Sequence, residues 1–282
     1  MTNGVFVDEL LELRDLALRL AREVAPIPAN AQPRVPQTRT MGTSTKSNEL
    51  DLVTELDKAT ERAIVSFLTA ERPQDGLMGE EGATTGSSSG YTWVIDPIDG
   101  SVNYFYGHPT WAISLGVIDA AGEPVVGVVH APQLQETFLA AKGSGAFLIS
   151  AGEWIQLQTP PVENDFSLAL LATGFPYDRE RRMAMAAVFA SFSPRVRDLR
   201  RIGSAAIDIC YVAAGRMHGY YERDTQPWDR AAAFAIAREV GLQTIVFGQP
   251  DHLSVGPNLS VVAMAGLATA LAVELAALGV TG

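Results

Sequence analysis

The stretch WVIDPIDGSVNYFYG, from Trp93 to Gly107, places two carboxylates directly after a run of apolar residues. Residues 91–95 are rich in β-branched and aromatic side chains, which predicts a buried strand. Asp96 and Asp99 follow that run, and Pro97 between them disfavours a helix at the residue before it. We therefore expect both acids at one end of a strand.

Gly100 and Ser101 come next, small residues whose backbone N–H groups can approach an anion closely. Two neighbouring aspartates repel each other, whereas a divalent cation lets both stay ionised and also binds phosphate oxygens. The stretch therefore suggests metal-assisted phosphate chemistry. Asp-Pro and Asp-Gly are also common turn dipeptides, so the motif alone is more often a turn than a site.

The composition is that of a globular protein of 282 residues, long enough for one large domain or two intimate ones. Its net charge of −11 argues against a nucleic-acid partner and against an anionic membrane surface, and leaves a small substrate compatible. Cys210 is the single cysteine, which excludes an intrachain disulfide and favours a cytoplasmic setting. The Ala-rich residues 261–280 include Glu274 and are expected to be a buried terminal helix, so no membrane span is expected.

Hydrophobic periodicity divides the chain into two parts of different character. Before Pro160 it predicts helices over 8–24 and from about Thr54 to Glu71, with four prolines in 26–36 breaking the first helix. The next part predicts a meandering antiparallel sheet, with strands at 112–118, 124–131, 137–141, 145–149 and 152–157. Beyond it, strands are predicted at 168–173, 218–222, 244–247 and 260–265, and helices at 179–192, up to 214, from 228 and at the end. We place a soft boundary between subdomains 1–160 and 161–282.

Other acids have both structural and functional explanations. Asp51 and Asp57 bracket a helix start, where capping would explain either, and we prefer capping for Asp51. Glu80 and Glu81 are adjacent, so at most one of them is expected to face a given site. Asp229 lies near the start of a helix, where acids commonly serve the helix itself.

Five segments, in this order, resemble the inositol monophosphatase family. They are DLVTELD (51–57), GEEG (79–82), WVIDPIDGSVNY (93–104), IGSAA (202–206) and WDRAA (228–232). The resemblance implies an α/β (α+β) fold, a layered α-β-α-β-α sandwich of the sugar-phosphatase type. It also implies a homodimeric, often lithium-sensitive hydrolase that uses two or three Mg²⁺ ions per site.

Carried over residue by residue, the resemblance assigns roles to the acids. Glu80, Asp96 and the backbone carbonyl of Ile98 would bind a first metal, and Asp96, Asp99 and Asp229 a second. Glu80 would also help to hold a third ion, with Asp57 supporting the site. Water polarised by Glu80 and Ser101 would attack phosphorus, and the N–H groups of Gly100 and Ser101 would receive phosphate oxygens.

The leaving-group side is assigned in the same way. The residues placed around the substrate polyol are Asp99, Gly203, Ser204, Ala205, Glu222 and Asp229. Glu222 could accept two sugar hydroxyls, or could be a solvated acid at the end of a strand. Lys46 matches a family lysine near the third metal. Ser101 stands where the family usually has threonine, which keeps the hydroxyl but loses its rotamer restraint.

The sequence thus predicts a Mg²⁺-dependent phosphatase for inositol 1-phosphate or a similar polyol phosphate. Histidinol phosphate, fructose 1,6-bisphosphate, nucleotide 3′-phosphates and NADP are alternative substrates for the same chemistry. Asp224 leaves a cationic substrate open, and Arg200 and Arg201 leave a bisphosphate slightly open. A non-catalytic regulatory protein that binds RNA polymerase or RNA is the alternative from another class.

Overall fold

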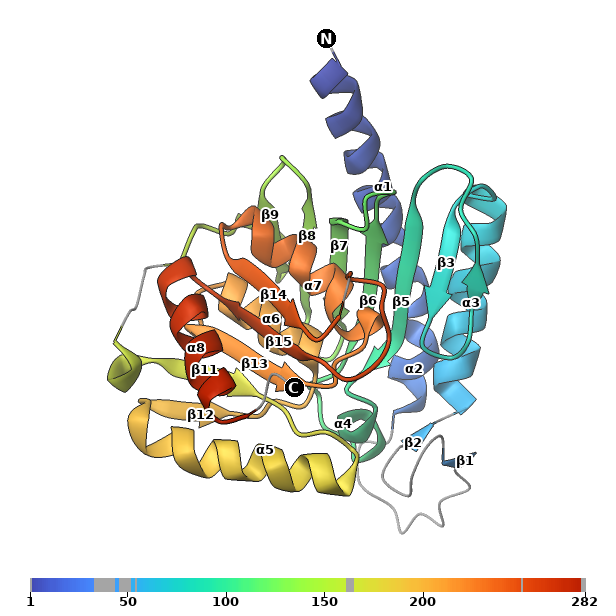
Figure 1. The fold of residues 1–282 in the computed structure, drawn as a ribbon. Helices are drawn as coiled ribbons and strands as arrows, with labels where there is room; N and C mark the ends of the chain where they lie inside the picture. Colours follow the sequence, from blue (N-terminus) through green and yellow to red (C-terminus); the bar gives the residue numbers. More distant parts are fainter. Residues whose placement is uncertain are drawn as a thin grey trace.

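The computed structural model describes residues 2–32, 44–45, 52–53, 55–160, 165–249 and 251–279. Helices and sheets alternate in five layers, in the order helix, sheet, helix, sheet, helix (Figure 1). The predicted α-β-α-β-α sandwich is confirmed. Lys46 and Asp51 lie outside the described residues.

The boundaries of the elements follow the sequence periodicity closely. The α-helices are α1 (Thr2–Val24), α2 (Pro26–Ala31), α3 (Glu55–Glu71), α4 (Ser101–Phe105), α5 (Arg179–Phe192), α6 (Ala205–Ala213), α7 (Pro227–Glu239) and α8 (Ala265–Ala277). The strands of the first half are β1 (Ser44–Thr45), β2 (Leu52–Val53), β3 (Gly76–Gly79), β4 (Thr84–Thr85), β5 (Thr92–Asp99), β6 (Ala112–Ile118), β7 (Pro124–Ala131), β8 (Glu136–Ala141), β9 (Ala146–Ser150) and β10 (Glu153–Gln156). The strands of the second half are β11 (Leu170–Thr173), β12 (Asp198–Arg200), β13 (Gly219–Arg223), β14 (Gln243–Phe247) and β15 (Leu259–Ala263), and two 3₁₀ turns cover Phe166–Leu168 and Ser193–Arg195.

The two large sheets differ in topology. The first has the order β10-β9-β8-β7-β6-β5-β3-β4, and β5 to β10 form the antiparallel meander that the sequence predicts. β3 joins it parallel to β5, so the ends of these two neighbouring strands meet at the same edge. The second sheet has the order β12-β11-β13-β15-β14, with β11 parallel to both of its neighbours.

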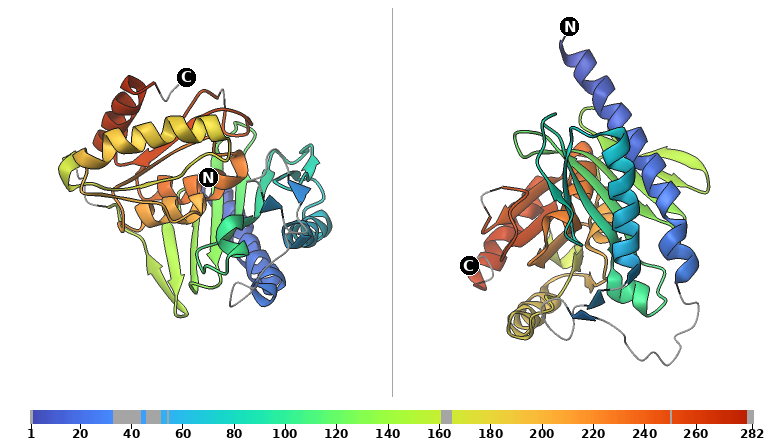
Figure 2. Two further views of the ribbon diagram at one scale, coloured as in Figure 1. Left: turned by 90° about the horizontal axis from the view of Figure 1, so that it is seen from below. Right: turned by 90° about the vertical axis from the view of Figure 1, so that its right-hand side faces the viewer.

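Three large apolar cores hold the layers together. α1 and α3 lie side by side on one face of the first sheet, where Leu10, Leu20 and Ile64 are fully buried (Figure 2). α6 and α7 fill the space between the sheets. α5 and α8 pack on the outer face of the second sheet, where Phe192 and Leu271 are buried.

α7 approaches the first sheet unusually closely, because two glycines face it. Gly116 on β6 pairs with Gly127 on β7. A Cβ at Gly116 would lie 2.8 Å from the backbone nitrogen of Ala232, and one at Gly127 would overlap the Ala232 carbonyl. Because α7 carries small alanines at 231–233, its backbone can pack directly against the backbone of β6 and β7. The position of α7 on the first sheet is therefore fixed closely.

The structure differs from the sequence prediction in the stretch after α1, where we expected the prolines to break the helix. The proline-rich stretch after α1 is helical at Pro26–Ala31, because proline is tolerated at the first helical position, and the Tyr104 hydroxyl donates to the Pro28 carbonyl (2.9 Å). The division at residue 160 stays a prediction. Among the described residues, no helix combines the length and apolar character needed to cross a bilayer.

Candidate active site

Asp96 and Asp99 lie within the last residues of β5, not in a turn after it. The pairing of β5 with β6 shifts register between these two acids, and Pro97, which has no N–H to donate, occupies the irregularity. The Asp96 carboxylate accepts the Ile98 N–H (3.0 Å), which holds the local bend. This irregularity lets two acids three positions apart reach the same point.

Asp229 joins them from the first turn of α7. One oxygen from each of Asp96, Asp99 and Asp229 lies within 4.8 Å of the others. Asp229 also accepts the backbone N–H of Gln226 (2.6 Å) as part of a capping box. Asp229 therefore both caps α7 and contributes an oxygen to the acid cluster. Three predicted metal ligands from two distant chain segments are thus brought together.

The electrostatics of Asp96 show how strongly the acids of this cluster affect one another. Burial is the largest cause that raises the pKa of Asp96 well above its ordinary value, and Glu80, Asp99, Asp229 and Asp57 raise it further. Glu80 and Asp57 are therefore within electrostatic reach of Asp96. Several buried carboxylates that repel one another fit a hard divalent cation, because oxygen ligands suit Mg²⁺ and its charge removes the repulsion.

The Ile98 carbonyl, another predicted ligand, accepts a hydrogen bond from the Ser101 hydroxyl (3.3 Å). Ser101 and Gly100 begin α4, and Gly100 has φ +94°, a conformation that disfavours other residues. A Cβ there would also lie 3.2 Å from the Gly203 carbonyl. Glycine at position 100 therefore lets the turn after β5 touch the loop before α6.

Glu61 was not found by sequence reasoning, although it holds the loop that carries Glu80. Its buried carboxylate accepts the N–H groups of Glu81 (2.8 Å) and Ala83 (3.0 Å). The signal available in the sequence was its position four residues after Asp57, which places both acids on one face of α3.

The start of α6 binds Asp99 directly. The Ser204 hydroxyl and the Ala206 N–H (2.8 Å) both donate to Asp99 Oδ2, and the Ala205 N–H is 3.3 Å from Oδ1. Burial raises the pKa of Asp99 to about 7 in spite of these hydrogen bonds, which lower it. Ser204 and Ala205, predicted as polyol contacts, therefore hold a predicted metal ligand.

Asn103, on α4, ties the same region together and was also missed. Its amide donates to the carbonyls of Thr110 (2.7 Å) and Ile202 (2.8 Å). Gly203 has φ +97°, and a Cβ there would lie 2.9 Å from the Asn103 amide nitrogen. The loop before α6 is thus attached to α4 at the edge of the acid cluster.

Glu222, on β13, is the predicted polyol acceptor and is not a solvated side chain. It is half-buried and receives the Tyr220 hydroxyl (2.9 Å). Burial raises its pKa to about 7, more than the Tyr220 hydrogen bond lowers it. A Cβ at Gly174, directly after β11, would overlap the Glu222 carboxylate. Gly174 therefore leaves the space that Glu222 occupies.

Asp208, on α6, is a further buried acid that sequence reasoning missed. Its side chain is about 1% exposed, and burial followed by the charges of Glu222 and Asp99 raises its pKa well above the ordinary value. Hydrogen bonding by the Gly203 backbone acts in the opposite direction and lowers this pKa, while Asp208 Oδ1 has no hydrogen-bond partner among the described residues. In the sequence it is indistinguishable from an ordinary acid in the first turn of a helix.

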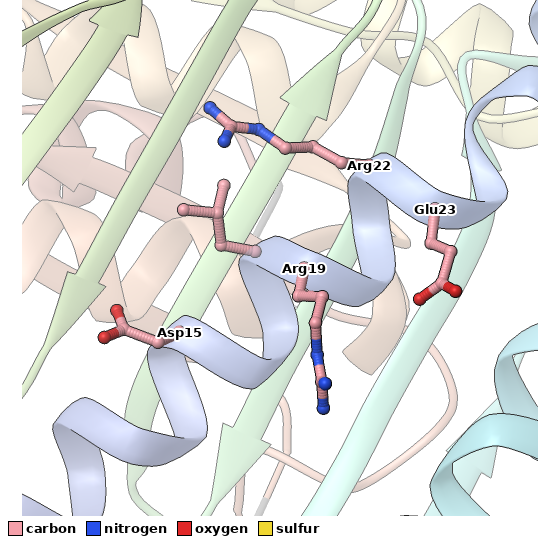
Figure 3. Close-up of a pocket in the computed structure, with 5 residues that line it drawn as sticks. Asp15, Arg19, Arg22 and Glu23 are labelled. Atoms are coloured by element: carbon pink, nitrogen blue, oxygen red, sulfur yellow. The ribbon is translucent and has the colours of Figure 1, made fainter.

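A hollow on another part of the surface lies along α1 and is unrelated to the acid cluster. Its lining residues are Asp15, Leu18, Arg19, Arg22 and Glu23 (Figure 3). None of the predicted site residues lines it. Arg19 contacts Glu71 (3.4 Å) and the ring of Phe67, which are ordinary surface interactions.

Comparison with known proteins places this geometry in a family. The family model described as "Inositol monophosphatase family" matches residues 9–277. The chain belongs to the inositol monophosphatase family. The resemblance inferred from the five sequence segments is thereby confirmed.

Three relatives illustrate the range of this family. The inositol-1-monophosphatase of Mycobacterium leprae is 40% identical over 82% of this chain and 80% of its own length. The Nus factor SuhB of Pasteurella multocida is 39% identical over 80% of this chain and 82% of its own. Among solved structures, Mycobacterium tuberculosis SuhB superposes with a TM-score of 0.80 at 36% identity, covering 96% of this chain and 98% of that one.

Proposed function

We propose that the protein is a Mg²⁺-dependent phosphatase that hydrolyses a small polyol phosphate, with inositol 1-phosphate as its preferred substrate. The observation that carries this proposal is the convergence of Asp96, Asp99 and Asp229 within 4.8 Å, with Glu80 and Asp57 in electrostatic reach. Such a set of oxygen ligands suits metal-assisted displacement at phosphorus.

The same residues would hold the metal ions. Asp96, Glu80 and the Ile98 carbonyl would bind one ion, and Asp96, Asp99 and Asp229 a second, with Glu80 contributing to a third. When bound, Mg²⁺ would supply charge that stabilises the phosphoryl oxygens and makes a water molecule more acidic.

The chain's own groups would then position the reactants. The Ser101 hydroxyl donates to Ile98, so its lone pairs can accept a hydrogen bond from the attacking water, and Glu80 would accept the proton of that water. The N–H groups of Gly100 and Ser101 would receive phosphate oxygens. Asp57, which is also within electrostatic reach of Asp96, would support the site of the third ion together with Glu80.

The leaving group would lie between the start of α6 and the end of β13. Glu222 would accept two hydroxyls of the polyol, with its orientation set by the Tyr220 hydroxyl. Asp99, Asp229 and the Gly203–Ala205 loop would form the remaining wall. The inositol-1-monophosphatase name of the Mycobacterium leprae relative supports this substrate class.

Rival substrates use the same machinery, and a regulatory role does not need it. Histidinol phosphate, fructose 1,6-bisphosphate and nucleotide 3′-phosphates stay alternatives for the hydrolysis. One relative carries the name Nus factor SuhB, which brings a regulatory function into consideration. We favour hydrolysis over a purely regulatory role. Metal-dependent catalysis needs the complete set of clustered acids, whereas a protein that only binds a partner would not need them.

The proposal is tested by phosphate release from the four substrate types with Mg²⁺ and with EDTA, in the parent and in Asp96→Asn. Asp15→Asn is the matched control, because Asp15 is exposed and outside the acid cluster. We expect turnover that EDTA abolishes, that the control keeps, and that Asp96→Asn loses. Metal-dependent turnover by Asp96→Asn at the parent's rate would rule out the proposed ligand set.

The assembly and setting are part of the same proposal. A homodimer is expected from the family resemblance, and sedimentation would measure it. Inhibition by Li⁺ is expected in the phosphate-release assay. A chain with a single cysteine cannot form an intrachain disulfide, and we therefore propose a cytoplasmic location.

A further inference from the structure

Asp224 is held in a conformation that side-chain-bearing residues rarely adopt. It follows β13 directly and has φ +64°. Its N–H donates to the Asn258 carbonyl (2.9 Å), and its carbonyl accepts the Gln226 side-chain amide (2.7 Å). The backbone on both sides of Asp224 is thereby fixed, and so is the direction of its side chain.

The carboxylate of Asp224 is covered by an arginine from another layer. Arg181, in the first turn of α5, places Nη1 3.2 Å from Asp224 Oδ1. The Arg181 side chain is 45% exposed, whereas that of Asp224 is 12% exposed and both of its oxygens are inaccessible. Arg181 therefore lies on the solvent side of the pair and covers the Asp224 carboxylate.

Asp224 acts on the residue proposed to bind the leaving group. Its negative charge is one of the causes that raise the pKa of Glu222, after burial and the charge of Asp229. Asp224 is thus within electrostatic reach of Glu222, two residues along the chain. The end of β13 thus carries two neighbouring carboxylates. Asp224 is in direct contact with Arg181, whereas Glu222 makes no ion pair among the described residues and feels the charge of Arg201 only at longer range.

We propose that the Arg181–Asp224 ion pair determines leaving-group specificity, by making the site select neutral polyols over leaving groups that carry an ammonium group. This inference rests on the proposed phosphatase function. With Arg181 in place, Asp224 is neutralised and covered, and an approaching ammonium meets the arginine's positive charge. Without Arg181, Asp224 and Glu222 would together offer two carboxylates, which a cation prefers and a neutral polyol does not need.

The test compares kcat/KM for inositol 1-phosphate and for histidinol phosphate with Mg²⁺. The variants are Arg181→Gln, the double variant Arg181→Gln/Asp224→Asn, and the matched control Arg179→Gln on the same exposed turn of α5. We expect Arg181→Gln to raise the ratio for histidinol phosphate over inositol 1-phosphate about tenfold, the effect of one charge-assisted hydrogen bond. The double variant should return to the parent's ratio, and the control should keep it.

The outcomes separate this inference from the proposed function. A parent enzyme that hydrolyses none of the substrate types with Mg²⁺ would overturn the proposed function. A parent that turns over inositol 1-phosphate while Arg181→Gln keeps the parent's ratio would overturn only the inference. A raised ratio that persists in the double variant would also overturn it, because Asp224 would then not be the acid that binds the ammonium group.

Discussion

Replacing Gly174 with alanine should damage recognition of the leaving group and spare the chemistry. A Cβ at this position would overlap the Glu222 carboxylate, which is the far end of a flexible side chain and can move. The protein should therefore fold. Glu222 would leave the position in which it accepts the Tyr220 hydroxyl (2.9 Å).

The magnitude follows from the hydrogen bonds that the displaced Glu222 no longer makes. One hydrogen bond to a charged group contributes about 1.5–3 kcal/mol, which corresponds to about 10- to 150-fold in kcat/KM. The loss should be seen with inositol 1-phosphate, whose hydroxyls Glu222 would accept. p-Nitrophenyl phosphate has no hydroxyls on its leaving group, so its kcat/KM should change much less.

The assay is steady-state phosphate release from both substrates by Gly174→Ala, Gly86→Ala and the parent. Gly86→Ala is the control, since nothing lies within 4 Å of a Cβ at that position. Thermal unfolding of each variant checks that the fold is kept. Equal losses on the two substrates, or no loss on inositol 1-phosphate, would refute the assignment of Glu222 to the leaving group.

Three further predictions concern the acids. Glu61→Ala should raise the Mg²⁺ concentration needed for half-maximal activity, because two buried N–H groups lose their acceptor and release the Glu80 loop; Glu55→Ala, exposed on the same helix, should not. Asp208→Leu should lower the free energy of unfolding in urea by about 1–3 kcal/mol through loss of the Gly203 hydrogen bond, and Asp208→Asn, which keeps an acceptor, should not. In EDTA the Tm should fall between about pH 4 and pH 7. The raised pKa values of about 7 for Asp99 and Glu222 give stability that is complete below about pH 4 and lost as pH rises to 7, so a flat or rising Tm would contradict them.

Local patterns predicted the secondary structure well because each element has a strong periodic signal of its own. α5 begins at Arg179 and ends at Phe192 as expected, and the meander follows the alternation of apolar runs and turns. α2 was missed because prolines were taken as breakers, although the first turn of a helix accepts them. Whether a proline ends a helix or begins one depends on its position in that helix, and composition alone does not give this position.

The acid cluster was predicted from the motifs and the resemblance, whereas its supports were not. Glu61 and Asn103 act through hydrogen bonds to other segments, and Asp208 is affected by the charges of Glu222 and Asp99. The local sequence of all three is that of ordinary helix residues. Gly174 likewise has meaning only beside Glu222. The roles of such residues depend on their neighbours in space. Hydrophobic periodicity in a single sequence does not reveal these neighbours.

The backbone contact between α7 and the paired glycines of β6 and β7 has a consequence for engineering. Asp229 is carried on α7 and Asp99 on β5, so the contact with Gly116 and Gly127 fixes the spacing of acids that lie in different layers. Enlarging either glycine would push α7 away from the first sheet and so shift Asp229 relative to Asp99, without changing an acid. Arg181 and Gly174, in contrast, lie outside that contact. Libraries aimed at new substrates should therefore diversify the outer residues and leave the two glycines unchanged.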